Sequence, residues 1–290
     1  MTIDLRNPPG ELEVRFKNQK LLVYAFHADQ FKPYVKELYT LSGDNVLVDA
    51  PPDHRHHHGL MFAFWINGIN FWEEKDSPGV EKPVELVSYI TDKTEDNLPR
   101  ARFTELIHWL PEKSRDATNS ESLALLIELR TLTLTVDDRN QEVALGWTSE
   151  FQVGPNAGKV KLHGSNYNGL GLRPAFTSEQ GAAFENAATK PYVGNNTQDV
   201  IPAEWTSLLG TTHSRNVQLV LFGHPSNRGA PSGFFTMTRP FVYLAATQQL
   251  DQAPLEYSAG ERFTLRYLLT VSPVQSSREA IQQHFTRWVK

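Results

Sequence analysis

Polar and apolar side chains alternate without interruption in Thr131-Leu132-Thr133-Leu134-Thr135-Val136. Successive side chains of a β-strand point to opposite faces of a sheet. The alternation therefore predicts a strand that turns its two leucines and its valine inward and its threonines outward. The turn residues 137–140 follow, and residues 143–147 resume the alternation. Two strands joined by a short turn are expected here.

The same period of two recurs along the chain, punctuated by 18 glycines and 18 prolines. We expect strands at 12–16, 21–26, 101–110, 122–136, 159–163, 217–223, 233–238, 241–247 and 261–271. We expect loops at 113–121, 154–158, 175–200 and 225–232. Many strands with few helices predict an all-β fold, a large two-sheet antiparallel sandwich. No internal repeat or linker is visible, so residues 1–290 are expected to form a single β-sandwich domain.

One amphipathic helix is expected at about 276–289, at the C-terminal end of the chain. Ser276 and Glu279 have the spacing of a capping box, in which each side chain bonds the other's backbone. Apolar residues then recur at helical spacing, at Ile281, Phe285 and Trp288. The helix should pack this stripe against the sheets.

Composition excludes several classes of function. The formal charge of −5 argues against nucleic acid as a partner, because phosphate binding requires a basic surface. There are no cysteines, which excludes disulfides, thiolate metal sites and a cysteine nucleophile. No apolar run approaches the ~20 residues of a membrane helix. The first 20 residues are rich in charge, so a cytoplasmic protein is expected unless a signal peptide has been removed. The oligomeric state stays open.

Four of the ten histidines fall within five positions of Pro51-Pro52-Asp53-His54-Arg55-His56-His57-His58-Gly59. If this stretch were extended, His54, His56 and His58 would share one face and His57 would face the other way. Three imidazoles on one face could ligate a divalent metal. Without a metal, the same histidines could bond sugar hydroxyls or transfer protons. A purely structural role is the third alternative. The glutamate that a cupin places after its second histidine is missing here.

Aromatic residues follow the histidines, and Trp65, Phe71 and Trp72 could stack on the C–H face of a sugar ring. A packed core position is the alternative for each of them. Asn67-Gly68 between these aromatics is a strong hairpin-turn signal. Tyr34, Asp53 and Glu73 are further candidates for contacts with a ligand.

Two distant segments are also candidates for the site. The glycine-rich segment 163–173 begins with His163 and ends with Arg173, and it lacks the phosphate-binding loop pattern. The segment 224–228 offers a histidine, an amide and a guanidinium, from His224, Asn227 and Arg228. Asn195-Asn196-Thr197 matches a glycosylation sequon, which would carry little meaning in the expected cytoplasmic protein.

Three parts of the chain together resemble an uncharacterised bacterial family historically labelled methane oxygenase (PmoA-like). They are residues 32–39 with 51–60, residues 169–173, and residues 224–228 with 260–267. The resemblance implies a supersandwich similar to galactose mutarotase and a setting in bacterial carbohydrate catabolism. The true methane monooxygenase subunit is a membrane protein, and this chain shows no membrane segment, so that activity is not expected.

Mutarotase-like enzymes use a histidine acid and a glutamate base, so the resemblance implies His54, His56, His57 or His58 as the acid. Glu73, Glu74 and Glu256 are the candidates for the base. The predicted substrate-binding residues are Tyr34, Asp53, Trp72, Glu73, His163, Arg173, His224, Asn227 and Arg228.

The function expected from these observations is acid/base chemistry on a sugar or sugar derivative, by an epimerase, lyase or hydrolase. A metalloenzyme and a non-catalytic carbohydrate-binding protein are the alternatives. No cofactor is predicted. A divalent metal is possible, and its ligands would be His54, His56 and His58. A small-molecule sugar is the expected ligand, with no nucleic acid and no membrane as partners.

Overall fold

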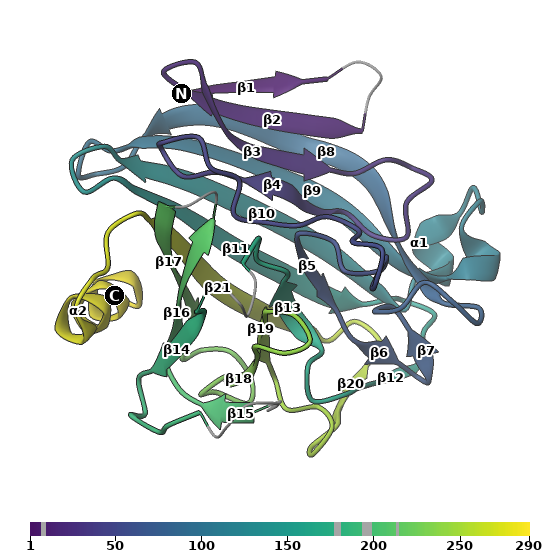
Figure 1. Ribbon diagram of the computed structural model, residues 1–290. Helices are drawn as coiled ribbons and strands as arrows, with labels where there is room; N and C mark the ends of the chain where they lie inside the picture. The colour runs from purple at the N-terminus through teal and green to yellow at the C-terminus, as the bar shows by residue number, and fades with distance from the viewer. Residues whose placement is uncertain (7–9, 177–180, 193–198, 213–214) are drawn as a thin grey trace.

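The computed structural model describes residues 1–6, 10–176, 181–192, 199–212 and 215–290. In these residues, two large antiparallel sheets form a sandwich, with a third, small sheet beside them (Figure 1). The predicted all-β sandwich is therefore confirmed. No described helix has both the length and the apolar character that crossing a membrane requires.

The first sheet contains nine strands within the described ranges. In spatial order they are β1 (Thr2–Leu5), β2 (Glu11–Phe16), β3 (Gln19–Ala25), β4 (Tyr34–Leu38), β5 (Leu60–Ala63), β13 (Gly169–Leu172), β19 (Tyr243–Thr247), β18 (Gly233–Met237) and β15 (Asp199–Pro202). β5, β13, β19 and β18 lie next to one another although they come from distant parts of the sequence. This neighbourhood supports the pocket described below.

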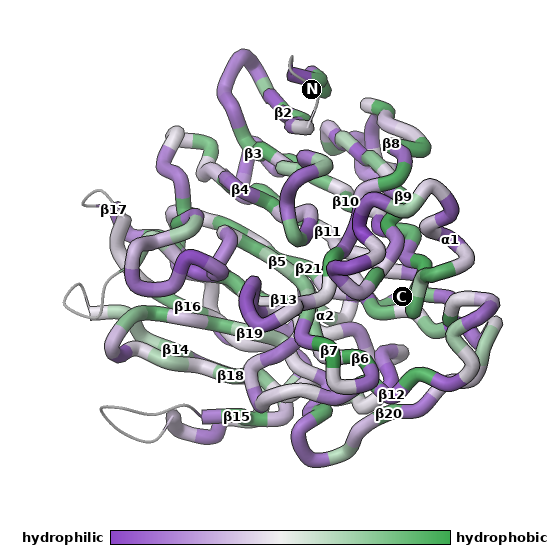
Figure 2. The backbone as a smooth tube through the Cα atoms, turned by 90° about the vertical axis from the view of Figure 1, so that its right-hand side faces the viewer, coloured by the Kyte–Doolittle hydropathy of each residue, from purple (hydrophilic) through white to green (hydrophobic). Residues whose placement is uncertain are grey.

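The second sheet contains eight strands in the same described ranges. They are β14 (Ala183–Asn186), β16 (Trp205–Thr212), β17 (Arg215–Gly223), β21 (Arg262–Ser272), β11 (Glu142–Val153), β10 (Leu126–Asp137), β9 (Pro99–Pro111) and β8 (Gly79–Lys93). The small sheet consists of β20 (Leu255–Ser258), β12 (Lys159–His163), β6 (Trp65–Ile66) and β7 (Ile69–Asn70). Hydrophobic residues concentrate along the strands, and hydrophilic residues concentrate in the connections (Figure 2).

The expected pair of alternating strands is confirmed by β10 and β11, which pair in an antiparallel register that places Leu132 opposite Trp147. Every second side chain of β10 is buried, including Leu132, Leu134 and Val136. The same alternation also places Glu128 and Arg130 on the buried face. A charged pair in the interior was not expected from the sequence.

Arg130 lies between the two sheets and has no exposed surface. Its guanidinium contacts a carboxylate oxygen of Glu81 and one of Glu128, both at 2.8 Å. It also donates to the backbone oxygen of Pro33, next to β4. Burial raises the pKa of Glu81 to about 8, so this carboxyl group is mostly protonated at neutral pH. The cluster therefore holds charge inside the sandwich by pairing it.

The C-terminal helix α2 spans Arg278–Trp288, as predicted. Its cap is Ser277, whose side chain accepts from the backbone N–H of Ala280. The expected capping box of Ser276 and Glu279 is therefore wrong, because the cap lies one residue later and alanine cannot complete a box. Ile281 and Phe285 are buried. They pack in a cluster with residues of β11, β16, β17 and β21, on one face of the second sheet (Figure 1).

Several expected boundaries are wrong. The strand expected at 122–136 begins only at Leu126, because residues Ser120–Leu123 form the short helix α1. The loop expected at 113–121 also contains most of the 3-10 helix η1 (Glu112–Ser114). The loop expected at 175–200 contains β14 and the start of β15. The sequon at 195–197 lies outside the described residues.

Candidate functional site

The histidine loop, residues 51–58 between β4 and β5, is a series of tight turns. The backbone N–H of His54 donates to the oxygen of Pro51, and the N–H of His57 donates to the oxygen of His54. A third bond joins the N–H of Ala50 to the oxygen of His57. The expected extended conformation is therefore wrong, because local hydrogen bonds fold the loop on itself.

This folding changes which imidazoles lie together. His54, His56 and His57 line one pocket, whereas His58 lies outside its lining. The expectation that His54, His56 and His58 share a face is thus wrong, and the histidine that differs is His58 rather than His57. Gly59 closes the loop against β4, where a Cβ would lie 2.2 Å from the backbone oxygen of Val35.

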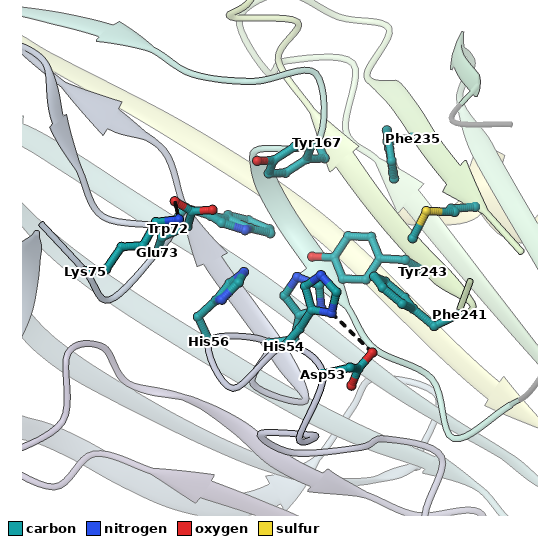
Figure 3. Close-up of a pocket in the computed structure, with 12 residues that line it drawn as sticks. Asp53, His54, His56, Trp72, Glu73, Lys75, Tyr167, Phe235, Phe241 and Tyr243 are labelled. Atoms are coloured by element: carbon teal, nitrogen blue, oxygen red, sulfur yellow. Dashed lines mark hydrogen bonds and ion pairs between the residues drawn. The ribbon is translucent and has the colours of Figure 1, made fainter. Parts of the chain in front are cut away.

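The pocket has a volume of about 380 Å³ and combines aromatic walls with a polar rim (Figure 3). Its apolar side chains come from the first sheet and from three loops, and they are Trp72, Tyr167, Phe235, Met237, Phe241 and Tyr243. Its polar side chains are Asp53, His54, His56, His57, Glu73 and Lys75. Met237 and Tyr243 stand opposite each other in the pairing of β18 with β19.

His56 and Glu73 both line the pocket, and the charge of Glu73 acts on the imidazole. Burial lowers the pKa of His56, while the negative charge of Glu73 acts in the opposite direction. Glu73 is held at one carboxylate oxygen, by Lys75 at 3.2 Å and by Asn70 at 3.3 Å. His56 is therefore a neutral imidazole at neutral pH, with a carboxylate nearby to favour its protonated form.

Arg173 contacts Asp53, His57 and Phe241. Its guanidinium is 2.8 Å from a carboxylate oxygen of Asp53 and 3.3 Å from Nδ1 of His57. It also covers the ring of Phe241, at 3.6 Å from the centroid. Because arginine can only donate, Nδ1 of His57 is the acceptor and the proton of this ring is on Nε2.

The protonation of this group follows from its surroundings. Burial, followed by the neighbouring imidazoles and Arg173, lowers the pKa of His57 to about 2. The hydrogen bond from Arg173 lowers the pKa of Asp53, also to about 2. His57 is therefore a neutral hydrogen-bond donor through Nε2, and Asp53 is an ionised carboxylate.

His58 joins two parts of the chain. Its Nδ1 is 3.0 Å from a carboxylate oxygen of Asp49, and its Nε2 is 2.9 Å from one of Glu74. The same oxygen of Glu74 accepts from the fully buried Lys32 at 2.9 Å. Tyr34 stacks on the imidazole, with centroids 4.3 Å apart. We call Lys32, Tyr34, Asp49, His58 and Glu74 the polar clamp.

The clamp also fixes the protonation of His58. Burial acts to lower the pKa of His58, but the hydrogen bonds to Asp49 and Glu74 outweigh it and raise this pKa. Burial acts to raise the pKa of Glu74, but His58 and Lys32 lower it to about 2. Glu74 is next to Glu73 in the chain, and His58 is next to His57. The clamp therefore holds the two segments that bring Glu73 and His57 to the pocket.

The predicted metal ligands are not brought together, since His58 bonds Asp49 and Glu74 while His54 and His56 line the pocket. Within the described parts of the chain, no group of three or more histidine, aspartate or glutamate side chains could hold a metal ion.

The remaining sequence candidates lie outside the pocket lining. Tyr34 donates to Asp49, and His163 accepts from the backbone N–H of Gly68. His224 contacts Ser226, and the ring of Trp288 on α2 lies beside it. The segment 224–228 therefore lies next to the C-terminal helix.

Asn227 and Arg228 also have partners in the fold. The amide of Asn227 bonds both backbone groups of Arg266. The guanidinium of Arg228 lies over the ring of Tyr257. Among the candidate bases, Glu74 belongs to the clamp and Glu256 pairs with Lys159 at the surface. Glu73 is the candidate base that lines the pocket.

Sequence reasoning missed several residues of the pocket, which are Lys75, Tyr167, Phe235, Met237, Phe241 and Tyr243. Those of β18 and β19 belong to runs that indicate only a buried strand. Tyr167 lies in the glycine-rich segment 163–173, which was a candidate for other residues. Tyr167 would have been predicted if every residue of that segment had been a candidate.

The chain belongs to the family described as "Family of unknown function (DUF6807)", which matches residues 11–286. This match carries a different name from the PmoA-like resemblance, which stays a prediction. No curated protein matches the chain in sequence.

Solved structures to which the chain is similar include a variant of a glycoside hydrolase family 97 enzyme from Pseudoalteromonas sp. strain K8. The identity is 9%, the TM-score is 0.47, and the match covers 90% of this chain and 35% of that one. The chain thus spans about a third of that enzyme's length. Another is a galactose mutarotase related enzyme from Lactobacillus acidophilus, at 7% identity and a TM-score of 0.41, covering 92% of this chain and 98% of that one.

Proposed function

We propose that the pocket binds an uncharged sugar or sugar derivative and that the protein performs acid/base chemistry on it. The observation that carries the proposal is the meeting of aromatic faces with imidazoles and carboxylates in one open pocket. Aromatic rings suit the apolar C–H face of a pyranose, and convergent polar groups suit its hydroxyls. His56 is the proposed base, and Glu73 is its charged partner.

The charges of the pocket favour an uncharged ligand. Its rim carries the carboxylates of Asp53 and Glu73. Among the described residues that line it, the one cation is Lys75, which already contacts Glu73. The guanidinium of Arg173 is bonded to Asp53 and His57. An anionic ligand would therefore meet carboxylates, while Lys75 and Arg173 are already paired.

The proposed step is a proton transfer. The neutral imidazole of His56 takes a proton from a C–H or O–H bond of the bound sugar, or from a water, and the electron pair of that bond stays on the carbon or oxygen. The carboxylate of Glu73 stabilises the imidazolium that forms. His56 then returns the proton to the substrate or to the leaving oxygen. The step is common to epimerisation, elimination and hydrolysis.

A panel of uncharged monosaccharides and disaccharides tests the proposal. Titration calorimetry measures binding, and mass spectrometry and NMR measure products. We expect His56→Ala to lose turnover by at least about 100-fold, as removal of a general base does. Glu73→Gln should also lose turnover, because the imidazolium then lacks its carboxylate. Their melting temperatures should stay near that of the wild type.

His163→Ala is the matched control, because this imidazole lies outside the pocket lining. It should retain full turnover. Wild-type turnover in His56→Ala would show that the proposed base is wrong.

Binding without catalysis is a second candidate function. Five aromatic side chains line the pocket, and stacking on them could account for sugar binding without a proton transfer. In that case the wild type would bind a sugar and release no product. Tyr167→Ala would then weaken binding more than His56→Ala does.

A further inference from the structure

Two side chains of the pocket lining, Trp72 and Tyr243, which we call the aromatic floor, each carry a polar atom without a hydrogen-bond partner among the described residues. These atoms are Nε1 of Trp72 and the hydroxyl oxygen of Tyr243. Trp72 is 1% exposed and Tyr243 is 3% exposed. In Figure 3 the hydroxyl of Tyr243 points into the space between Trp72 and the histidines.

Such atoms are rare, because a buried donor without a partner costs about 1–3 kcal/mol. The indole N–H can only donate, and a tyrosine hydroxyl donates while it is protonated. Burial holds the pKa of Tyr243 well above its ordinary value, so the hydroxyl keeps its proton. Both groups are therefore donors, and the ligand atom that suits them is an oxygen that accepts hydrogen bonds.

Gly171 in β13 lets the rings of Tyr243 and Trp72 pack closely against the backbone of the sheet. A Cβ at this position would lie 2.0 Å from the hydroxyl oxygen of Tyr243 and 2.8 Å from Cη2 of Trp72. Any larger residue would displace both rings. The absence of a side chain, rather than an unusual backbone angle, is what this position requires.

We infer that Trp72 and Tyr243 form an oxygen-binding subsite that sets specificity for a hydroxyl or ring oxygen of an uncharged sugar. The inference rests on the proposed sugar-binding function. A hydroxyl fits because it accepts from the indole and can exchange either role with tyrosine. A carboxylate fits less well, since Arg173 is already bonded to Asp53 and His57.

The first test is the stability of the unliganded protein. Tyr243→Phe removes an unpartnered hydroxyl and keeps the ring, so the melting temperature should not fall. Tyr267→Phe is the matched control, because this equally buried hydroxyl bonds the amide of Gln248. The control should melt at a lower temperature, since it leaves that amide without a partner. A comparable fall in Tyr243→Phe would show a hidden partner and overturn the inference.

The second test uses a sugar that binds the wild type, together with its series of deoxy analogues, in titration calorimetry. Tyr243→Phe should weaken binding of the parent sugar at least tenfold, as should removal of one specific hydroxyl. The two losses should not add, because they remove the same hydrogen bond. Equal affinities of the wild type and Tyr243→Phe for every analogue would overturn the subsite.

The two proposals fail in different ways. If the wild type binds no sugar of the panel, the proposed function is wrong, and the specificity inference is wrong with it. If the wild type binds a sugar but Tyr243→Phe binds it equally well, only the subsite is wrong. Tyr257→Phe, a buried tyrosine outside the pocket lining, controls for remote effects of the substitution and should bind as the wild type does.

Discussion

Neighbouring histidines of one loop have opposite chemistry. His57 accepts from Arg173 and has a pKa lowered to about 2. His58 lies between two carboxylates, and its pKa is raised. Both imidazoles are largely buried, so the difference comes from the charge of their partners. Two adjacent residues therefore differ in charge: His57 is a neutral hydrogen-bond donor, and His58 is a cation that holds the clamp together.

The protonation of His57 can be measured directly. We expect one histidine of the folded protein to remain neutral, with its proton on Nε2, down to about pH 4, because its pKa is about 2. Two-dimensional ¹H–¹⁵N correlation spectra that resolve the ring nitrogens identify this tautomer. Arg173→Gln should raise the pKa of that ring but leave it below the ordinary value, because burial is the largest cause of the shift. Titration of His57 near its ordinary pKa in the wild type would contradict the assignment.

His58 should make stability depend on pH. Its pKa is raised on folding, so its contribution is complete below the unfolded value of about 6.5 and is lost as the pH rises through the raised value. At about pH 6, we expect His58→Gln to lower the free energy of unfolding by about 2 kcal/mol. The difference from the wild type should shrink by about pH 9.

Urea denaturation at both pH values measures this difference. Glu74 affects the pH dependence of stability only in acid. Its pKa is lowered to about 2 on folding, so its contribution to stability is complete above the unfolded value of about 4.5 and is lost as the pH falls from there towards 2. A loss in His58→Gln that is the same at both pH values would mean that His58 is neutral in the folded protein.

The candidate site was predicted in part. The density of histidines marked His54, His56 and His57 as candidates, and all three line the pocket. The direction of each side chain could not be predicted, because it depends on hydrogen bonds inside the loop rather than on strand alternation. Phe235 and Tyr243 could not be predicted either, since aromatic residues in a buried strand have the pattern of a core.

At the scale of elements, Gly59 controls the position of the histidine loop. A Cβ there would lie 2.2 Å from the backbone oxygen of Val35, and backbone cannot move aside as a side chain can. Gly59→Ala should therefore destabilise the protein by more than about 2 kcal/mol and abolish ligand binding in the pocket.

Gly158→Ala is the control for this substitution. Gly158 also has a positive φ, of 65°, but a Cβ there would contact nothing within 4 Å. It should cost only about 1 kcal/mol and leave binding unchanged. Urea denaturation and calorimetry compare the two variants. Equal losses in both would show that the contact with Val35 does not matter.

Substitutions of Arg130 and Glu128 in β10 should have coupled effects on stability. Arg130→Met leaves Glu128 buried without its cation, and we expect a loss of about 3–5 kcal/mol in the free energy of unfolding. Glu128→Gln in the same background removes the unpaired charge and should recover at least about 1 kcal/mol. Urea denaturation of the single and double variants checks both values. Additive losses would contradict the pairing of these two residues.

The period of β10 was predicted correctly because every second residue is buried, whatever its chemical type. The inward position of Glu128 and Arg130 was not, since charge is normally expected to face solvent. The N-cap of α2 could not be predicted to the residue either. Both Ser276 and Ser277 can cap a helix, and the structure selects Ser277.

At the scale of the whole molecule, the sandwich brings together segments that are distant in the sequence. The histidine loop, the segment around Trp72 and strands β18 and β19 meet at one pocket (Figure 3). The fold class followed from alternation alone. The order of strands in the first sheet did not, because pairing of β5 with β13 depends on contacts across more than one hundred residues.

Exchange with deuterium tests the central claim most directly. Each sugar of an uncharged panel is incubated in D₂O with the protein, and ¹H NMR follows C–H exchange, the rate of interconversion of anomers and the release of new reducing ends. These readouts cover proton transfer from carbon, from a hydroxyl and from water. We predict that the wild type accelerates one of them on a sugar that it binds, and that His56→Ala and Glu73→Gln do not. Rates in the wild type equal to those without protein, or equal to those of both variants, would contradict the account.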